Sequence, residues 1–197
     1  MPAQLPGDLS ADLIRKTLLD AADIAGQITL PRFRQGIAVD NKWAVGFDPV
    51  TEADREAEKA IRALIGERFP DHAILGEEWE DKAGTAPWAW IIDPIDGTRA
   101  FVAGEETWAH SLAVAHKGKI TAGVVYLPAI DRIYVASETS APLRDGEVIL
   151  ASGRDRLEGA NILTTKANMA PEKWPGGVPE IIRSFRASLA YRMCLAA

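Results

Sequence analysis

The sequence predicts a mixed fold of the α+β or layered α/β class, in which helices pack against a sheet. Three observations support this prediction. Two early segments carry apolar residues at the helical period, short apolar strands with clear turn residues follow, and the pattern then weakens towards a final apolar helix. Helices followed by a run of strands are typical of a sheet that is covered by helices.

The two predicted helices come first in the chain. Ser10 can cap a helix that reaches about Ile28, and Thr51 can cap a second helix over 52–69, which Pro70 stops. Each helix has one apolar face, which we expect to be buried. These faces consist of Leu13, Leu18, Ala21, Ala22, Ala25 and Ile28 in the first helix, and of Ala53, Ala57, Ala60, Ile61, Leu64 and Ile65 in the second.

Short strands make up most of the rest of the fold. We expect them at 37–43, 73–76, 88–92, 111–116, 120–126 and 132–136. The short turns between the last three predict antiparallel hairpins. Beyond residue 141 we expect a strand at 161–165, a loop rich in proline and glycine at 169–177, and a strand end that enters an apolar helix at 184–197.

Composition narrows the classes of function. The net charge of −6 disfavours a nucleic-acid partner, because phosphate backbones require clustered Lys and Arg. No apolar run approaches the roughly 20 residues that span a bilayer, so no membrane partner is expected. The single cysteine, Cys194, allows no disulfide within the chain. The N-terminus has neither a basic region nor an apolar region of a signal peptide. We therefore expect a cytoplasmic protein.

Four carboxylates stand at positions where a fold of this kind brings side chains together. Glu77 and Asp93 each follow an apolar strand, Asp96 lies three residues further on, and Asp54 lies at the start of the second helix. Strands of an open sheet deliver ligand-binding side chains at their carboxyl ends. Carboxylates that converge there repel one another unless a cation is present, and Mg²⁺ prefers oxygen ligands. The pattern indicates a site for Mg²⁺, where two ions could clamp the attacking and leaving oxygens of an in-line displacement at a phosphate.

Gly97 and Thr98 follow these carboxylates directly. Glycine lets the backbone approach a ligand closely, and a helix or turn that begins there offers N–H groups to a phosphate. The Thr98 hydroxyl could orient a water molecule and pass a proton towards Asp54. The sequence therefore predicts a phosphate beside the metal site.

Each of these features has an ordinary structural interpretation when it is taken alone. Asp-Gly-Thr is most often a turn, Glu77-Glu78 a solvated loop, Lys42 a surface lysine and Thr51 an N-cap. Only the ordered set favours a functional site.

The ordered set resembles the inositol monophosphatase family of Mg²⁺-dependent, often lithium-sensitive phosphatases. The resemblance is carried by Trp90 to Thr98 with Phe101 and Val102, by Asp48 to Asp54, by Gly76 to Glu78, and by Gly123 to Tyr126 with Pro128. It implies a sugar-phosphatase-like αβαβα sandwich whose C-terminal part is incomplete. Residues 1–140 would form an N-terminal metal- and phosphate-binding α+β domain, and 141–197 would begin a C-terminal α/β domain.

The resemblance also implies roles for single residues. Glu77, Asp93 and the Ile95 carbonyl would bind a first Mg²⁺, Asp93 and Asp96 a second, and Glu77 a third, weaker ion through water. Gly97, Thr98 and Asp96 would contact the phosphate or the substrate. Thr98 and Asp54 would orient the attacking water, with Glu77 also part of the catalytic set. Lys42 matches a lysine near the loop that closes over the site.

One family feature is absent from this sequence. The second signature, whose aspartate completes the second metal site, should fall beyond residue 197. We therefore expect a C-terminally truncated member, with a naturally shortened protein as the alternative. The exposed apolar surface of the last helix would cost several kcal/mol at about 25 cal/mol per Å². We expect a chain that is poorly stable alone or that associates through this surface.

The substrate is left open between two small phosphorylated metabolites, an inositol monophosphate and histidinol phosphate. Arg99 before Phe101 resembles histidinol-phosphatase-type members, and Leu189 indicates a pocket unlike that of many inositol phosphatases. A phosphoadenosine nucleotidase is a further alternative, although the Lys-Glu pair typical of that branch is absent. Another alternative is a catalytically impaired fragment that binds metal or phosphate only. The family is commonly dimeric, so a homodimer is expected.

Overall fold

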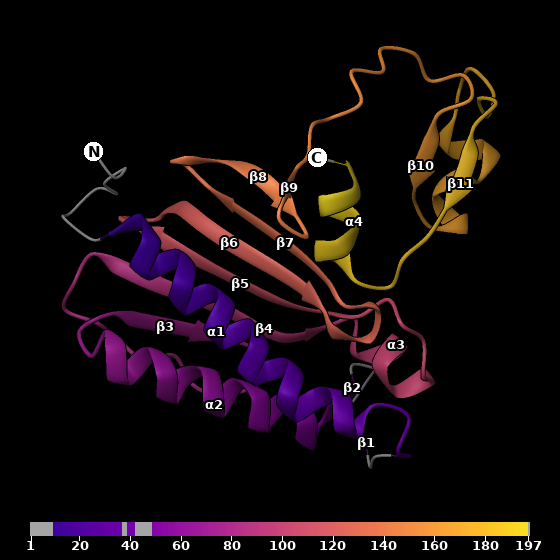
Figure 1. Ribbon diagram of the computed structural model, residues 1–197. Helices are drawn as coiled ribbons and strands as arrows, with labels where there is room; N and C mark the ends of the chain where they lie inside the picture. Colours follow the sequence, from indigo (N-terminus) through magenta and orange to yellow (C-terminus); the bar gives the residue numbers. More distant parts are fainter. Residues whose placement is uncertain (1–9, 37–38, 42–48, 197) are drawn as a thin grey trace.

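A seven-stranded sheet forms the centre of the computed structural model, which describes residues 10–36, 39–41 and 49–196 (Figure 1). Its strand order follows the chain from β3 to β9, so that consecutive strands are neighbours in the sheet. The strands are β3 (Ala73–Gly76), β4 (Trp88–Asp96), β5 (Ala109–His116), β6 (Lys119–Leu127), β7 (Arg132–Ser137), β8 (Ser140–Arg144) and β9 (Glu147–Val148).

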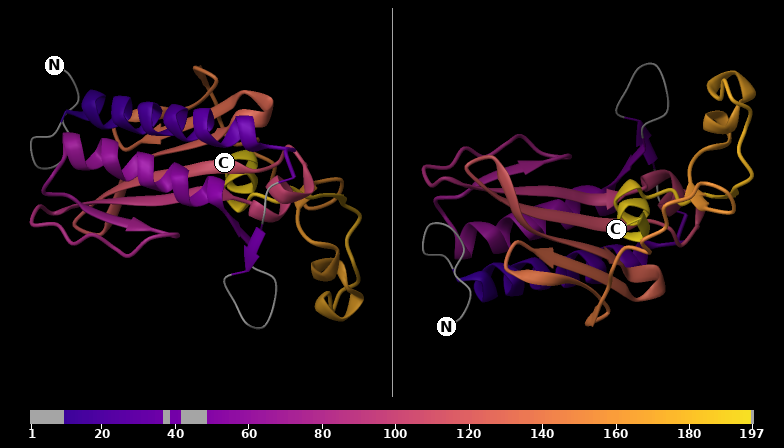
Figure 2. Two further views of the ribbon diagram at one scale, coloured as in Figure 1. Left: turned by 90° about the horizontal axis from the view of Figure 1, so that it is seen from below. Right: turned by 90° about the horizontal axis from the view of Figure 1, so that it is seen from above.

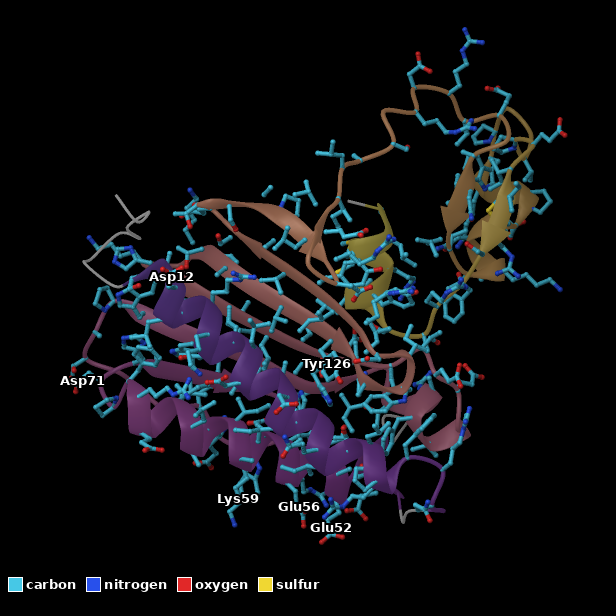
Figure 3. The ribbon with its side chains drawn as sticks, in the orientation of Figure 1. Asp12, Glu52, Glu56, Lys59, Asp71 and Tyr126 are labelled. Carbon is cyan, nitrogen blue, oxygen red and sulfur yellow. The ribbon has the colours of Figure 1, made fainter. Side chains whose placement is uncertain are left out.

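Two long helices, α1 (Ala11–Thr29) and α2 (Glu52–Arg68), cover one face of this sheet (Figure 2). Their apolar stripes and the inward side chains of the strands form the main core, because every second strand residue points to the helices. Among its members are Ile14 and Leu18 of α1, Ile61 and Ile65 of α2, and Trp90, Leu112 and Val124 of the sheet. The polar faces of the helices point outwards, as Glu52, Glu56 and Lys59 do in Figure 3.

The direction of the strands creates the edge where the predicted site lies. β3 and β4 are parallel, so their carboxyl ends, Gly76 and Asp96, lie on the same side of the sheet. The remaining neighbours in the sheet are antiparallel. The β4–β5 ladder contains a bulge between Asp93 and Asp96. A bulge bends its strand and changes the direction of its side chains and carbonyl groups.

Shorter elements surround this end of the sheet. α3 (Thr98–Ala103) follows β4 directly, and β1 (Val39–Asn41) pairs with β2 (Pro49–Thr51) just before α2. α4 (Leu189–Ala196) packs through Tyr191 on the sheet face away from α1 and α2, against Leu127 and Tyr134. β10 (Asn161–Leu163) and β11 (Ile182–Ser184) form a parallel pair apart from the main sheet (Figure 1).

The predicted mixed fold of helices layered on a sheet is confirmed, including both long helices and the antiparallel hairpins. The strand expected at 88–92 continues to Asp96 through the bulge, and the strand expected at 161–165 ends at Leu163. The expected burial of Leu13 in the first helix was also wrong, because its side chain is 42% exposed. β8 and β9 were not predicted, since they are short and largely exposed. They extend the sheet to Val148. The division of the chain into domains 1–140 and 141–197 stays a prediction. Within the described part of the chain, no helix is both long and apolar enough to cross a membrane.

Candidate functional site

A pocket of about 570 Å³ opens at the carboxyl ends of β3 and β4. The loop before α4 forms another wall through Phe185 and Ala187. The predicted residues that line the pocket are Glu77, Asp93, Ile95, Asp96, Gly97 and Thr98. The structure therefore brings together six residues from the end of β3, from β4 and from the start of α3.

Asp93 has the most unusual environment in this pocket. Its burial, followed by the nearby charges of Glu77 and Asp96, raises the pKa of Asp93 to about 9. A hydrogen bond with the Glu77 side chain and the charge of Asp54 act in the same direction. Its Oδ1 atom is buried and has no hydrogen-bond partner among the described residues. A buried acceptor without a partner is rare, and this one belongs to a carboxyl group near the acidic side chains of Glu77, Asp96 and Asp54.

Glu77 is held in place by a buried glutamate of α2. Glu58 Oε2 accepts the backbone N–H groups of Glu77 at 3.0 Å and Glu78 at 2.8 Å, while Oε1 accepts from Arg62 Nε at 2.7 Å. Gly76 makes this arrangement possible, because a Cβ atom there would lie 1.9 Å from Glu58 Oε1. The buried carboxylate thus fixes the chain at the point where Glu77 enters the pocket.

Asp54 and Thr98 are brought together across two elements, as the sequence predicted. Asp54 Oδ2 accepts the Thr51 N–H at 2.8 Å and the Thr51 hydroxyl at 2.5 Å, within the capping box of α2. The Thr98 hydroxyl lies 3.4 Å from Asp54 Oδ1 and 2.9 Å from the Ile95 carbonyl oxygen. Thr51 is therefore an N-cap, and its capping bonds also orient the buried Asp54 carboxylate.

Asp96 points towards α4 as well as towards the pocket. Its carboxylate accepts from the Ser188 hydroxyl at 2.7 Å and from the N–H groups of Leu189 at 3.1 Å and Ala190 at 2.6 Å. These donors belong to the first turn of α4, where N–H groups have no partner within the helix. Asp96 consequently couples the sheet to α4 over more than 90 residues of sequence.

α3 begins at the edge of the pocket. Gly97, the residue before it, has a φ of 94°, which favours glycine, and a Cβ there would approach Ser188 N to 3.1 Å. The first N–H groups of α3 belong to the segment of Gly97 and Thr98, both of which line the pocket. This geometry suits an anionic group beside the carboxylates.

The donor set fits a divalent cation, although it is not a complete cage. Glu77 and Asp93 supply carboxylates, Ile95 a carbonyl, and the orphaned Asp93 Oδ1 an oxygen that a cation would satisfy. Among the residues that the structure describes, no three acidic, His or Cys side chains converge closely enough to form a ready-made metal cluster. The bonds of Asp96 to α4 are consistent with this finding. Lys42 lies outside the described residues.

Two residues that shape the site, Glu58 and Ser188, were not predicted from the sequence. Glu58 left a signal, because it is an acidic residue on the apolar face of α2, one turn after Asp54. Ser188 left none, since its link to Asp96 depends on how the chain folds back after β11.

Known proteins resemble this chain in sequence. The model of the inositol monophosphatase family matches residues 10–196. A histidinol-phosphatase of Chlorobaculum parvum is 35% identical over 149 residues, which cover 75% of this chain and 57% of that protein. The chain thus spans little more than half the length of this relative.

Solved structures of other proteins have a similar fold. The extragenic suppressor protein suhB from Bartonella henselae superposes with a TM-score of 0.82 at 27% identity, covering 93% of this chain and 74% of that one. An IMPase of Thermotoga maritima superposes with a TM-score of 0.77 at 31% identity, covering 94% and 71%.

Proposed function

Because the chain belongs to the inositol monophosphatase family, we propose that its pocket serves a Mg²⁺-dependent phosphomonoesterase that hydrolyses a small phosphorylated metabolite. The observation that carries this proposal is the buried Asp93 Oδ1, which has no partner among the described residues and belongs to a carboxyl group near those of Glu77 and Asp96. A cation at this point would satisfy the oxygen and neutralise the cluster.

The metal ligands in this proposal are Glu77, Asp93, the Ile95 carbonyl and Asp96. Bound Mg²⁺, two or three ions in this proposal, would polarise the phosphate and make a water molecule a better nucleophile at neutral pH. Glu58 holds Glu77 at the edge of the pocket through the two backbone N–H groups. Asp96 would divide its oxygens between the cation and the first turn of α4.

The phosphate side of the pocket is formed by Gly97 and Thr98. Their N–H groups would bind the phosphate oxygens at the start of α3. The Thr98 hydroxyl, within reach of both Asp54 and the Ile95 carbonyl, would orient the attacking water. Asp54, buried and held by Thr51, would accept the proton that this water loses.

The substrate is proposed to be histidinol phosphate or an inositol monophosphate. The relative from Chlorobaculum parvum carries the first activity in its name, and the Thermotoga maritima structure is called an IMPase. Phe185 adds an aromatic wall to the pocket, and the guanidinium of Arg192 lies 5.3 Å from its ring centroid. An aromatic wall favours the imidazole ring of histidinol phosphate over the polar ring of inositol. The working protein is proposed to be a cytoplasmic homodimer.

A panel of phosphomonoesters tests the activity and the substrate together. Phosphate release should depend on Mg²⁺, stop after chelation, and be fastest with histidinol phosphate or inositol 1-phosphate. Phe185→Leu should lower kcat/KM for histidinol phosphate more than for inositol 1-phosphate. Equal and negligible rates on every ester would overturn the enzyme proposal.

A second candidate, a protein that binds metal and phosphate without turnover, is favoured by one observation. Asp96 is engaged by three donors from Ser188 and the start of α4. Calorimetric titration with Mg²⁺ and inorganic phosphate separates the two candidates, since binding without phosphate release supports this second one.

A further inference from the structure

His110 lies opposite the bulge that carries the predicted metal-binding segment. β4 contributes Pro94 and Ile95 between the paired positions Asp93–Ser111 and Asp96–Ala109, whereas β5 contributes His110 alone. Two residues thus face one, as in a β-bulge, and the regular ladder is interrupted here. Each buried backbone group in such a gap needs another partner.

The His110 side chain supplies that partner for one of the two carbonyl groups. Its Nδ1 atom lies 2.5 Å from the Pro94 carbonyl oxygen, and the imidazole is completely buried. A carbonyl oxygen can only accept, so Nδ1 carries a proton and donates. The other bulge carbonyl, that of Ile95, accepts from the Thr98 hydroxyl at 2.9 Å and lines the pocket. The two carbonyl groups therefore point to different partners, one towards His110 and one towards the site.

The second ring nitrogen connects this arrangement to α1. His110 Nε2 lies 3.1 Å from the Thr29 hydroxyl oxygen, and that hydroxyl also donates to the Ala25 carbonyl at 2.9 Å. Burial lowers the pKa of His110 to about 4, so the ring is neutral near pH 7. Its Nε2 is then an acceptor, and it competes with the Ala25 carbonyl for the single proton of Thr29. Trp108 and Tyr126 pack around the ring, with centroids 5.5 and 6.0 Å away.

We propose that His110 is a positioning residue, whose Nδ1–H bond to Pro94 shapes the Asp93–Asp96 bulge for cation binding. Without this donor, the Pro94 carbonyl would be buried without a partner and the bulge would rearrange to satisfy it. Asp93, the Ile95 carbonyl and Asp96 all lie within one or two residues of that carbonyl, so they would move with it. Groups behind metal ligands typically change metal affinity about 10- to 100-fold.

This inference rests on the metal site proposed above, and matched substitutions test it. His110→Leu removes both ring nitrogens, whereas His110→Asn is smaller but returns an N–H donor near the position of Nδ1. His110→Gln instead places its amide near the position of Nε2 and faces Thr29. Mg²⁺ affinity of the full chain is measured by calorimetry, and the melting temperature in chelator reports stability.

The expected order of affinities follows from the position of the donor. His110→Leu and His110→Gln should weaken Mg²⁺ binding about tenfold or more. His110→Asn should stay close to the parent chain, even where its melting temperature falls as far as that of His110→Gln. Thr29→Val should lower the melting temperature and leave the Mg²⁺ affinity unchanged.

Three results would overturn the inference. Equal Mg²⁺ affinity in the Asn and Gln variants would show that the donor at Nδ1 has no special role, and this comparison holds even if His110→Leu does not fold. A parent chain and a folded Leu variant that bind Mg²⁺ equally would also refute it, while the proposed function stands. A parent chain that binds no Mg²⁺ would overturn the proposed metal site and this inference together.

Discussion

Asp93 gives the pocket a pH dependence that can be measured without substrate. Because its pKa is raised from 3.8 to about 9, the folded chain holds a proton that the unfolded chain loses. The group therefore stabilises the metal-free fold below about pH 4, and this contribution is lost as the pH rises towards 9. A cation that replaces the proton reverses the trend, since it binds the ionised form more tightly at higher pH.

The predicted outcome is a melting temperature that falls from pH 5.5 to pH 8.5 in chelator and falls less in Mg²⁺. The rise in melting temperature caused by Mg²⁺ should thus be larger at pH 8.5. Asp93→Asn should remove most of the pH dependence and most of the Mg²⁺ dependence of the melting temperature. Thermal unfolding monitored by circular dichroism measures both, and a Mg²⁺ effect of the same size at both pH values would contradict this prediction.

Glu58 allows a second test at the residue scale. Glu58→Gln removes the charge that faces Arg62 and weakens the acceptor for the Glu77 and Glu78 N–H groups. Breaking a buried ion pair from one side costs about 3 kcal/mol of unfolding free energy. Glu56→Gln on the same helix is the matched control, because its surface pair with Arg32 contributes at most about 1 kcal/mol. Urea denaturation compares them, and equal losses would refute the role of Glu58.

Much of the residue set could be predicted from the sequence, and the limits have a physical cause. Glu77 follows β3, Asp93 follows the apolar part of β4, and Thr98 begins α3, so the local pattern of the sequence indicates all three positions. His110, Glu58 and Ser188 act through contacts with residues 16 to 92 positions away. Such contacts depend on register and on chain reversal, and a local period does not reveal them.

At the scale of elements, α4 is tied to the site by its first turn. The Ser188 hydroxyl donates to Asp96 and accepts the Tyr191 N–H at 2.9 Å, so Ser188 is the N-cap of α4. Ser188→Ala should cost about 1 kcal/mol and increase hydrogen exchange in residues 189–196. Ser152→Ala, at an exposed position, is the control. Unchanged exchange in α4 would show that the cap does not hold this helix.

The elements that were predicted well are those with a strong periodic signal. α1 and α2 have regular apolar faces, and β5 to β7 are joined by short turns. β4 was cut short because Asp93-Pro94 is a common turn sequence, yet here the ladder continues to the Asp96–Ala109 pair. A bulge depends on the partner strand, which the local sequence does not contain.

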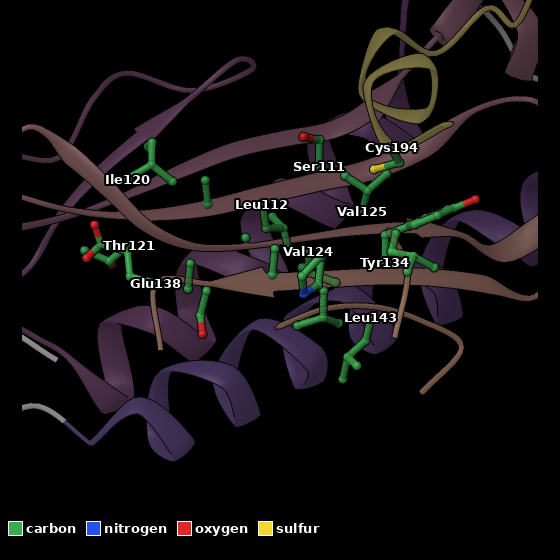
Figure 4. A pocket seen from close by; sticks show the side chains of 18 residues that line it. Ser111, Leu112, Ile120, Thr121, Val124, Val125, Tyr134, Glu138, Leu143 and Cys194 are labelled. Carbon is green, nitrogen blue, oxygen red and sulfur yellow. The ribbon is translucent and has the colours of Figure 1, made fainter. Parts of the chain in front are cut away.

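At the scale of the whole molecule, the sheet has two unequal faces. α1 and α2 cover one face, whereas the other carries an apolar hollow of about 480 Å³ between β5, β6, β7 and Cys194 of α4 (Figure 4). Leu189 and Met193 of α4 are 54% and 65% exposed. Exposed apolar surface of this kind favours association.

We predict that the chain self-associates in a concentration-dependent way through the exposed apolar side chains of α4. Leu189→Gln combined with Met193→Gln should shift the equilibrium towards the monomer, because each substitution replaces exposed apolar area with a polar amide. Leu13→Gln on α1 is the control, as it is also exposed but lies on the helical side of the sheet. Sedimentation velocity over a range of concentrations measures the effect, and a parent chain that stays monomeric throughout would contradict it.

We propose above that the pocket at the ends of β3 and β4 hydrolyses a phosphomonoester with the help of Mg²⁺ bound at Asp93. The most direct test measures phosphate release from histidinol phosphate and inositol 1-phosphate in Mg²⁺, with the parent chain, Asp93→Asn and Asp71→Asn. Asp71 is the matched control, since it is exposed and lies just before the start of β3, at the end of the strand away from the pocket (Figure 3). We predict Mg²⁺-dependent release by the parent chain and by Asp71→Asn. The rate of Asp93→Asn should fall at least about a hundredfold, which is the effect of removing one group that stabilises the transition state. Equal rates in the two variants would contradict it.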